Sequence, residues 1–351
     1  MEIDIYSKYS TVSINDSEAW NAIVKEAITY DIYHTSDYHN LEQTGQSILF
    51  VYRNEQTLIA LPVIKRTIEN SFYVDCTSVY GYAGPISNTL FENLDEQIIG
   101  DFIQSLLSFF EAENIVSVFC RLHPIINQQS VLHTMGGVHN NGKTVAIDLR
   151  SSLETQRLKY RRSIRQKVNQ LRKKGFTVKV ADTNAEIEEF IEIYFETMVK
   201  VNASASYFFD KEYFFGLLDA KDFDTKLILA YLDGKITSGL LLTFSNSIVQ
   251  THLAATRNEF LYEGPMKLLF DEATLIGREA GMDYVHLGGG VGGNEDSLFE
   301  FKAGFSDTFL EFNTWRYIAN QSAYDQLVQE KCGEGDLTST MFPLYRHAPS
   351  K

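Results

Sequence analysis

Cysteine is scarce in this sequence, whose 351 residues include only three, at positions 76, 120 and 332. They form no Cys-x-x-Cys pair, so neither a disulfide framework nor a cysteine zinc site is expected. The eight histidines show no His-Glu-x-x-His or comparable spacing, and we therefore expect no bound metal.

Long apolar segments are missing as well. No run approaches the length needed to cross a bilayer, and the N-terminal MEIDIYSKYS is acidic and polar, unlike a signal peptide. Both observations, with reduced thiols, predict a cytoplasmic protein. The length exceeds one typical core, so we expect domains at 1–150 and 151–330 and an irregular tail at 331–351.

Basic residues are in the minority, and the net charge of −15 should repel nucleic acid and anionic membranes in general. The exception is RLKYRRSIRQKVNQLRKK at 157–174, which has nine Lys and Arg and no acid. A Ser151-x-x-Glu154 capping box precedes this segment and Gly175 follows it. These signals predict one helix, about 152–174, at the start of the second domain.

On that helix Arg161, Arg165 and Arg172 fall within about 40° of one another and border the apolar face. Two interpretations stay open for these arginines. They form either a solvated basic face or an anion-binding ridge at the rim of a cleft, where arginine suits bidentate phosphate contacts.

The sequence contains an internal repeat. FVYRNEQTLIALPVI at 50–64 lines up with LAYLDGKITSGLLLT at 229–243, and Tyr-Ala-Gly-Pro at 82–85 lines up with Tyr-Glu-Gly-Pro at 262–265. Each Tyr-x-Gly-Pro precedes an amphipathic helix and then a short apolar strand. Two copies of one unit predict a duplicated α/β domain with a mixed sheet.

Apolar periodicity predicts the individual elements. Helices are expected at 94–113, 183–200 and 265–281, and strands at 47–53, 57–65, 115–120, 226–232, 236–244, 247–256, 283–287 and 308–318.

The order of elements and several motifs together resemble the FemABX family of peptidoglycan-bridge aminoacyltransferases, especially FemAB-like proteins of cell-surface polysaccharide synthesis. The motifs are YGYAGPI at 80–86, RLHP at 121–124, RRSIRQKVNQLRKKGFTV at 161–178, HLAATRNEFLYEGP at 252–265 and LGGGVGGNEDSLFEFKAGFS at 287–306. The resemblance implies tandem GNAT-like acyltransferase units. It also implies an amide-forming enzyme without a bound cofactor, whose co-substrate is aminoacyl-tRNA or acyl-CoA.

The last motif has five glycines within 288–293 and satisfies Gly-x-Gly-x-x-Gly. A dinucleotide loop would open a full helix and precede a second parallel strand with an acid at its tip, and neither follows here. The run also lacks the Lys-Ser/Thr of a P-loop. We interpret Gly289 and Gly290 instead as residues that bring the backbone close to a substrate.

Residues around the reaction centre follow from the resemblance. It implies that Lys302 stabilises the negative charge of a tetrahedral intermediate, and that Phe301 lies beside it, where packing is the alternative role. His252 in the central strand is a candidate for orienting the substrate or taking a proton, although a structural role is the alternative. His286 has a weaker claim of the same kind.

Further residues are candidates for binding the substrates. Tyr80 and Tyr82 offer hydroxyls and flat faces to a saccharide or peptide acceptor, and turn packing is their alternative. Arg121 and His123, at a strand end, suit a carboxylate or phosphate, as do Arg161 and Arg165. Tyr207 is a candidate for the wall of the cleft, and packing in the core is its alternative.

The acyl donor and the acceptor stay open. Between the strand expected at 247–256 and the helix expected at 265–281 the chain reads ATRNEFLYEGPMK. This segment lacks the compact glycine loop whose N–H groups hold the pyrophosphate in coenzyme A enzymes, and Pro265 has no N–H to donate. Aminoacyl-tRNA would need the basic segment at 157–174, while the coiled-coil insertion of the bridge enzymes is missing.

Three functions therefore remain. The first is an N-acyl or aminoacyltransferase acting on an amine of a cell-envelope precursor, with an amino sugar or nucleotide-linked amino sugar as the expected acceptor. The second is an acetyl-CoA-dependent N-acetyltransferase. The third is a non-catalytic module that binds tRNA or an anionic glycan. A lipid-linked saccharide acceptor would require peripheral membrane contact.

Overall fold

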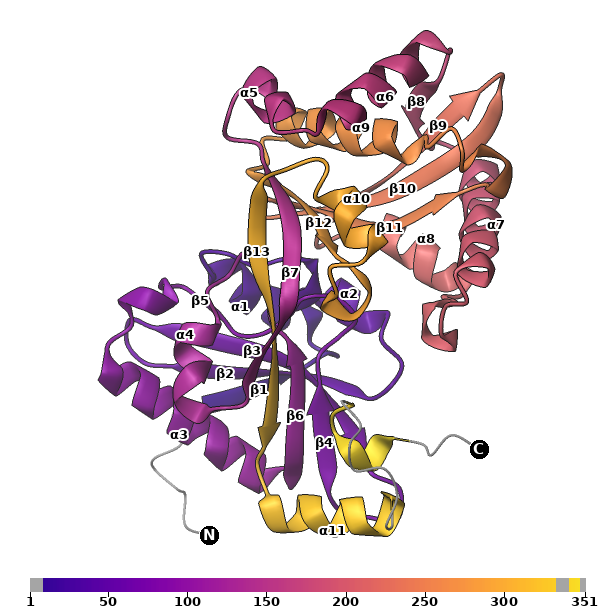
Figure 1. Ribbon diagram of the computed structural model, residues 1–351. Helices are drawn as coiled ribbons and strands as arrows, with labels where there is room; N and C mark the ends of the chain where they lie inside the picture. The colour runs from indigo at the N-terminus through magenta and orange to yellow at the C-terminus, as the bar shows by residue number, and fades with distance from the viewer. Residues whose placement is uncertain (1–8, 333–340, 348–351) are drawn as a thin grey trace. The chain divides into compact units, whose positions relative to one another are not determined.

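The computed structural model describes residues 9–332 and 341–347 (Figure 1). These residues form two compact units. The first runs up to Asn141 and resumes at Glu311, and the second is Gly142–Leu310. The boundaries therefore fall within two long strands, β7 (Val138–Asp148) and β13 (Thr308–Ile318). We had expected domains that end at residues 150 and 330.

The first unit has a mixed sheet in the order β1-β2-β3-β4-β6-β13, with β5 paired to β3. Its strands are β1 (Tyr9–Ser13), β2 (Gln46–Arg53), β3 (Leu58–Thr67), β4 (Val74–Thr77), β5 (Ile86–Ser87) and β6 (Ile115–Arg121). Its helices are α1 (Ser17–Glu26), α2 (Ser36–Asn40), α3 (Glu96–Ala112), α4 (Gln129–Leu132) and α11 (Gln321–Cys332), with 3-10 turns η1 (Ile32–His34), η2 (Phe91–Asn93), η3 (His133–Met135) and η7 (Leu344–Arg346). Of the expected tail at 331–351, residues 333–340 and 348–351 lie outside the described part of the chain.

The second unit has a mixed sheet in the order β7-β12-β11-β10-β9-β8. Its other strands are β8 (Thr177–Val180), β9 (Asp224–Leu232), β10 (Lys235–Ser245), β11 (Ile248–Thr256) and β12 (Tyr284–Gly289). Its helices are α5 (Leu153–Leu158), α6 (Arg162–Lys173), α7 (Asn184–Lys200), α8 (Lys211–Asp219), α9 (Met266–Glu279) and α10 (Ser297–Lys302), with 3-10 turns η4 (Ala205–Tyr207), η5 (Asn258–Phe260) and η6 (Val291–Gly293).

The two units confirm the predicted duplication. From β1 in one unit and from β8 in the other, three antiparallel pairings are followed by one parallel and one antiparallel pairing. The last strand of each sheet comes from the other half of the sequence, because β13 pairs with β6 and β7 pairs with β12. The fold is thus a tandem α/β architecture with mixed sheets, as the repeat predicted.

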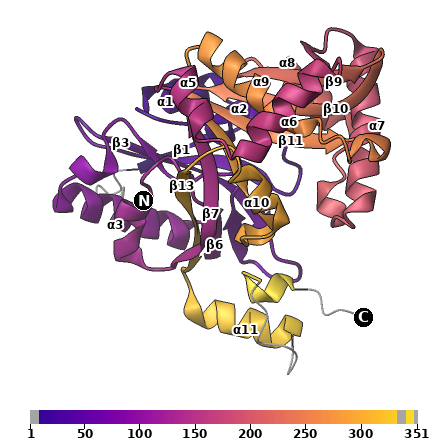
Figure 2. The ribbon, with the colours of Figure 1, turned by 45° about the horizontal axis from the view of Figure 1, so that its top comes forward.

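Helices cover both faces of the second sheet. Helices α6 and α9 pack together and against one face (Figures 1 and 2). On β10, Leu240 and Leu242 join that core cluster, whereas Gly239 approaches Phe190 of α7 on the opposite face. The alternation follows from the two-residue period of a strand. A capping box formed by Thr183 and Glu186 opens α7, the helix expected at 183–200.

The basic segment forms two helices and not the single helix we expected. The chain leaves the helical path at Arg161, which has an extended ψ and caps α6. Just before this break the ring of Tyr160 is buried 5.3 Å from the Phe305 ring, and the Arg161 amide donates to the Gly304 carbonyl. Packing against the segment after α10 therefore overrides the local helical pattern.

No helix among the described residues is both long enough and apolar enough to span a membrane.

Candidate active site

The central strands of the second unit, β11 and β12, pair over only three residues of each. The parallel ladder runs from Ile248 with Tyr284 to Gln250 with His286. Beyond these residues both strands continue, to Thr256 and Gly289, without pairing to each other. This separation lies directly before the glycine run at 288–293.

Both strands also carry a bulge where they separate. Leu241 and Leu242 of β10 pair with Leu253 and Thr251, so His252 is an extra residue on β11. On β12 the pairing with β7 skips Leu287 in the same way. A bulge bends a strand and re-aims a side chain, and bulges are over-represented beside active sites.

His252 has a tyrosine partner that the sequence analysis missed. The Tyr213 hydroxyl lies 2.7 Å from His252 Nε2, and the two rings are inclined by 28°. Tyr213 lies on α8, whose cap Asp210 accepts its backbone N–H. No local signal could have revealed the pair, because 39 residues separate its members.

His286 is enclosed in a different way. Its ring is fully buried, with Nδ1 at 2.8 Å from Gln250 Oε1 and Nε2 at 2.9 Å from Thr144 Oγ1. Both ring nitrogens are thus occupied by side chains of neighbouring strands, which favours the structural alternative for this residue.

Lys302 lies at the end of α10, and its Nζ donates to the Gly289 carbonyl of β12 at 2.7 Å. Burial lowers the pKa of this ammonium to about 8, and the charge of Asp296 opposes the shift. Asp296 in turn caps α10 by accepting from the amides of Phe299 and Val291. A partly buried lysine with a pKa near neutrality marks a functional-site candidate.

The two glycines beside Lys302 are required by the chain's own turn. A Cβ at Gly290 would collide with the Asn294 carbonyl and the Asp296 carboxylate, and one at Gly289 would lie 2.7 Å from the Lys143 carbonyl. Close packing therefore accounts for both missing side chains. The substrate-binding role of Gly289 and Gly290 stays a prediction.

Phe301 packs in the core and also faces a cation. Its ring lies 5.4 Å from that of Phe270, and Lys267 Nζ lies 5.2 Å from the Phe301 centroid. Lys267 is in the first turn of α9, and burial and the charge of Lys167 lower its pKa. A cation in the first turn of a helix, where the helix dipole is positive, makes a favourable place for an anion.

Most of the basic segment is neutralised within the second unit. Six of its nine cations lie within 4.0 Å of carboxylates from α9, α10 and the adjoining loops. The pairs are Arg157 and Arg172 with Asp271, Lys159 with Asp307, Arg161 with Glu300, and Lys167 and Lys174 with Glu263. The main role of these six charges is therefore to hold α5 and α6 against their neighbours, and they are not available to a ligand.

Arg161 and Arg165 consequently differ. Arg161 binds both the carboxylate and the carbonyl of Glu300, at 2.7 and 3.1 Å, and so ties the start of α6 to α10. Arg165 has no ion-pair partner within the described residues. It lines an open groove of about 520 Å³ with residues of α5, where its guanidinium can meet an anion.

In the first unit His123 is already paired with a carboxylate. Its Nε2 lies 2.8 Å from Asp31 Oδ2, and both side chains are fully buried. The His123 amide donates to Gln128, whose own amide donates to the carbonyls of Ala83 and Pro85. These bonds hold the Tyr-x-Gly-Pro turn against the end of β6.

The other candidates of the first unit surround the same turn. The Tyr38 hydroxyl donates to the Tyr80 carbonyl at 2.7 Å, and the Tyr82 ring contacts the rings of Tyr33, His123 and Phe312. Arg121 lies over the Phe119 ring at 5.5 Å. Their acceptor-binding roles stay predictions.

The first unit does not repeat the strand separation. After β4 the Ser78 amide donates to the Phe119 carbonyl, the Ala83 amide donates to the Arg121 carbonyl, and Ala83 bridges to Leu122. The Tyr-x-Gly-Pro turn thus continues the ladder along β6. Among the described residues, the open pair of strands that an acyl group could enter therefore belongs to the second unit.

The predicted residues thus form separate groups. One group is at α10: Lys302 and Phe301 belong to this helix, and Gly289, Gly290 and Arg161 lie against it or its cap. His252 lies on β11. Tyr207 is 38% exposed on η4, and its carbonyl accepts the Tyr194 hydroxyl. Tyr80, Tyr82, Arg121 and His123 gather in the first unit.

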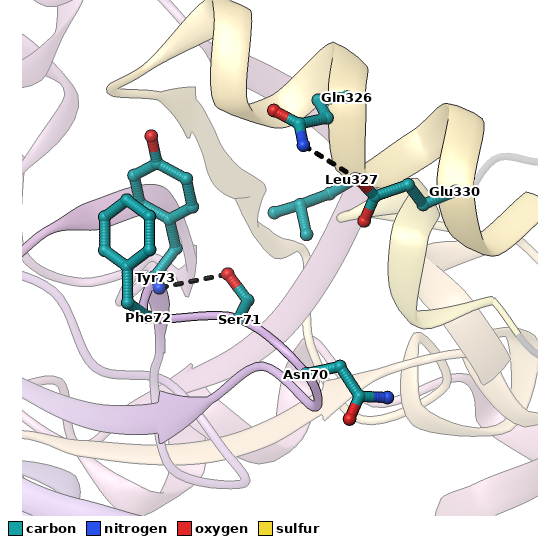
Figure 3. A pocket seen from close by; sticks show the side chains of 7 residues that line it. All are labelled: Asn70, Ser71, Phe72, Tyr73, Gln326, Leu327 and Glu330. Carbon is teal, nitrogen blue, oxygen red and sulfur yellow. Dashed lines mark hydrogen bonds between the residues drawn. The ribbon is translucent and has the colours of Figure 1, made fainter.

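A larger groove in the first unit lacks suitable chemistry. About 560 Å³ is enclosed by the Asn70–Tyr73 turn and by Gln326, Leu327 and Glu330 of α11 (Figure 3). Here Gln326 donates to Glu330 at 2.8 Å, and no histidine, lysine or cysteine lines the groove. Within the described residues no three His, Cys, Asp or Glu side chains are arranged to hold a metal.

Comparison with known proteins agrees with this geometry. A family model described as an acetyltransferase (GNAT) domain matches residues 159–302, which contain β8 to β12, His252 and Lys302. No curated protein sequence matches the chain.

Several solved structures share the whole fold. FemX is 16% identical, with 90% of this chain and 99% of that chain covered and a TM-score of 0.71. L-PGS from Bacillus licheniformis is 15% identical, with 89% and 94% covered and a TM-score of 0.57. A conserved protein of unknown function from Bacteroides thetaiotaomicron is 11% identical, with 88% and 99% covered and a TM-score of 0.56.

At these identities the likeness concerns the fold, and the family match concerns the second unit. Residues 159–302 match an acetyltransferase (GNAT) domain, so the second unit is a GNAT-type acyltransferase domain, and the chain shares the fold of FemX.

Proposed function

We propose that the protein forms an amide by transferring an acyl or aminoacyl group to an amine of a cell-envelope precursor. An amino sugar or nucleotide-linked amino sugar is the acceptor, and the reaction takes place in the cytoplasm. The observation that carries the proposal is the group of features at the end of β12. There β11 and β12 separate beside the bulged His252 of β11, and the partly buried Lys302 donates to the Gly289 carbonyl of β12.

Lys302 has the properties of an oxyanion stabiliser. One of its three N–H donors is used by the Gly289 carbonyl, which fixes the ammonium and leaves two donors. With a pKa of about 8 it is mostly charged at pH 7. A fixed positive charge in a partly desolvated site stabilises the alkoxide that forms when the amine attacks the acyl carbon.

His252 provides a route for the proton. As the new C–N bond forms, the attacking nitrogen loses a proton to the imidazole, and the oxyanion collapses to expel the donor group. The leaving thiolate or ribose oxygen then takes that proton. Such proton transfer typically contributes about 10²- to 10⁴-fold to the rate.

The donor is proposed to bind on the α6 and α9 side of the second unit. Lys267, whose ammonium lies over the Phe301 ring, suits a phosphate group. An aminoacyl-tRNA would meet Arg162, Arg165 and Lys173, which have no acid partner among the described residues. Tyr80 and Tyr82 remain the proposed contacts of the acceptor, with Arg121 proposed for its phosphate or carboxylate.

Acetyl-CoA is the second candidate donor, and the family match favours it, because the matching model is described as an acetyltransferase domain. In that reaction the same Lys302 would stabilise the intermediate. The leaving group would be the thiolate of coenzyme A.

Mass spectrometry of reaction mixtures separates these possibilities. The protein is incubated with UDP- and dTDP-linked amino sugars and with lipid-linked saccharides, with acetyl-CoA in one arm and charged tRNA in the other. Lys302→Met should abolish the product, and Lys211→Met, at an exposed lysine of the same unit, should retain it. An amide product in neither arm would contradict the proposal and favour a non-catalytic module that binds tRNA or a glycan.

A further inference from the structure

We propose that Tyr213 is the positioning residue of the reaction, holding the His252 imidazole in the tautomer that accepts a proton at Nδ1. This inference rests on the proposed function, because it assigns a partner to the proposed proton acceptor. The carrying observation is the 2.7 Å contact between the Tyr213 hydroxyl and His252 Nε2.

The tyrosine is rigidly held. Its ring stacks on Phe209 at 4.2 Å and 12°, and on its other partner, His252, at 6.1 Å and 28°. Its backbone N–H is bound by the Asp210 carboxylate that caps α8. The cap holds the backbone of Tyr213 and the stacking holds its ring, so the side chain loses little further freedom when it binds the imidazole and can set the direction of the hydrogen bond.

The hydroxyl suits both protonation states of histidine. When its oxygen accepts from Nε2–H, the neutral ring carries its lone pair on Nδ1. After Nδ1 takes the proton of the attacking amine, Nε2–H still donates to the same oxygen. No group has to reorient during the transfer, and Tyr213 itself stays neutral throughout.

His286 provides a comparison within the same unit. Its two ring nitrogens are both occupied by side chains of the sheet, Gln250 and Thr144, as expected for a structural residue. His252 instead is the extra residue of a bulge, at the point where two strands stop pairing. The tyrosine contact thus belongs to the histidine that the backbone directs away from the regular ladder.

The kinetic test replaces Tyr213 by phenylalanine, which keeps the ring and removes the hydroxyl. We expect kcat to fall at least about 10-fold, as for loss of a group that fixes a catalytic tautomer, while KM changes less than twofold. The acid limb of the kcat profile should move to lower pH, because the imidazolium loses an acceptor. Tyr231→Phe, which removes the 2.6 Å bond from Tyr231 to Glu186, is the matched control and should leave both unchanged.

A second measurement does not depend on activity. The ¹⁵N shifts of the His252 ring report its tautomer in the wild-type protein and in Tyr213→Phe. We expect hydrogen on Nε2 in the wild type and a mixture of tautomers in the variant. Hydrogen on Nδ1 in the wild type, or the same tautomer in both proteins, would overturn the inference. An inactive wild type with the expected tautomer would instead count against the proposed function alone.

Discussion

The buried histidines of the first unit make its stability depend on pH. Burial lowers the pKa of His34 to about 4 and that of His39 to about 3, from an ordinary value of 6.5. The charge of His123 also lowers the pKa of His34, while Asp31 opposes the shift. Both rings are therefore neutral in the folded protein at pH 5, where they are protonated in the unfolded chain.

The sign and size of the effect follow from linkage. Between pH 6.5 and the folded pKa values the unfolded state binds more protons, so the free energy of unfolding falls as the pH falls. At pH 5 each histidine is about 1.5 units below its unfolded pKa, which corresponds to about 2 kcal/mol. The two together should lower the stability of the first unit by about 4 kcal/mol between pH 7.5 and 5.

Urea unfolding at these two pH values, followed by tryptophan fluorescence, measures this difference. Both tryptophans, Trp20 and Trp315, are buried in the first unit and so report on it alone. His39→Gln should shrink the pH difference by about 2 kcal/mol, whatever it does to stability at pH 7.5. His139→Gln, at an exposed position, should leave the difference unchanged.

The reasoning would be refuted by an equal pH difference in His39→Gln and the wild type. Carboxyl groups do not obscure the result, because they remain largely ionised above pH 5. A smaller difference in His139→Gln would show instead that surface histidines carry the effect.

Other predictions concern the second unit. Lys302→Met should lower the rate of acyl transfer at least about 100-fold. It should also raise the free energy of unfolding by about 2 kcal/mol at pH 7, because the pKa of Lys302 is lower in the folded protein than in the unfolded chain. Rate measurements and urea unfolding of both proteins check the two effects. The rate should fall as the pH rises through about 8, because Lys302 loses its charge there. The residual activity of Lys302→Arg should not fall over this pH range, because arginine stays charged. Asp271→Asn should cost about 3 kcal/mol, because two arginines share that buried carboxylate, whereas Asp307→Asn at the surface should cost less than about 1 kcal/mol by circular dichroism. Gly290→Ala should cost about 1–3 kcal/mol in the same assay, since its Cβ has no room.

Much of the fold could be predicted because its signals are local. The capping box at Thr183 and Glu186 and the apolar strand runs depend on neighbouring residues alone. The break at Arg161 could not be predicted, because it follows from contacts with Gly304 and Phe305, more than 140 residues later. The pairing of β7 with β12 and of β13 with β6 could not be predicted either, because it also joins segments that are far apart in the sequence.

The part of the candidate site that lies in a recognisable sequence motif could be predicted. The resemblance pointed to Lys302, and the structure adds the Gly289 contact that lowers the freedom of its ammonium. The neutralisation of the basic segment could not be foreseen, because its acids, such as Asp271 and Glu300, come from distant helices. The sequence shows how many charged residues a segment contains, but the fold determines how many of them are paired with acids and how many remain for a ligand.

The most direct test of the central claim is product formation by the wild-type protein and by Lys302→Met, measured by mass spectrometry with amino-sugar acceptors and both classes of acyl donor. We expect an amide product from the wild type with one donor class, and none from a Lys302→Met protein that is at least as stable. Equal product from both proteins would show that the chemistry does not depend on Lys302 at the end of α10, and would contradict the proposed mechanism.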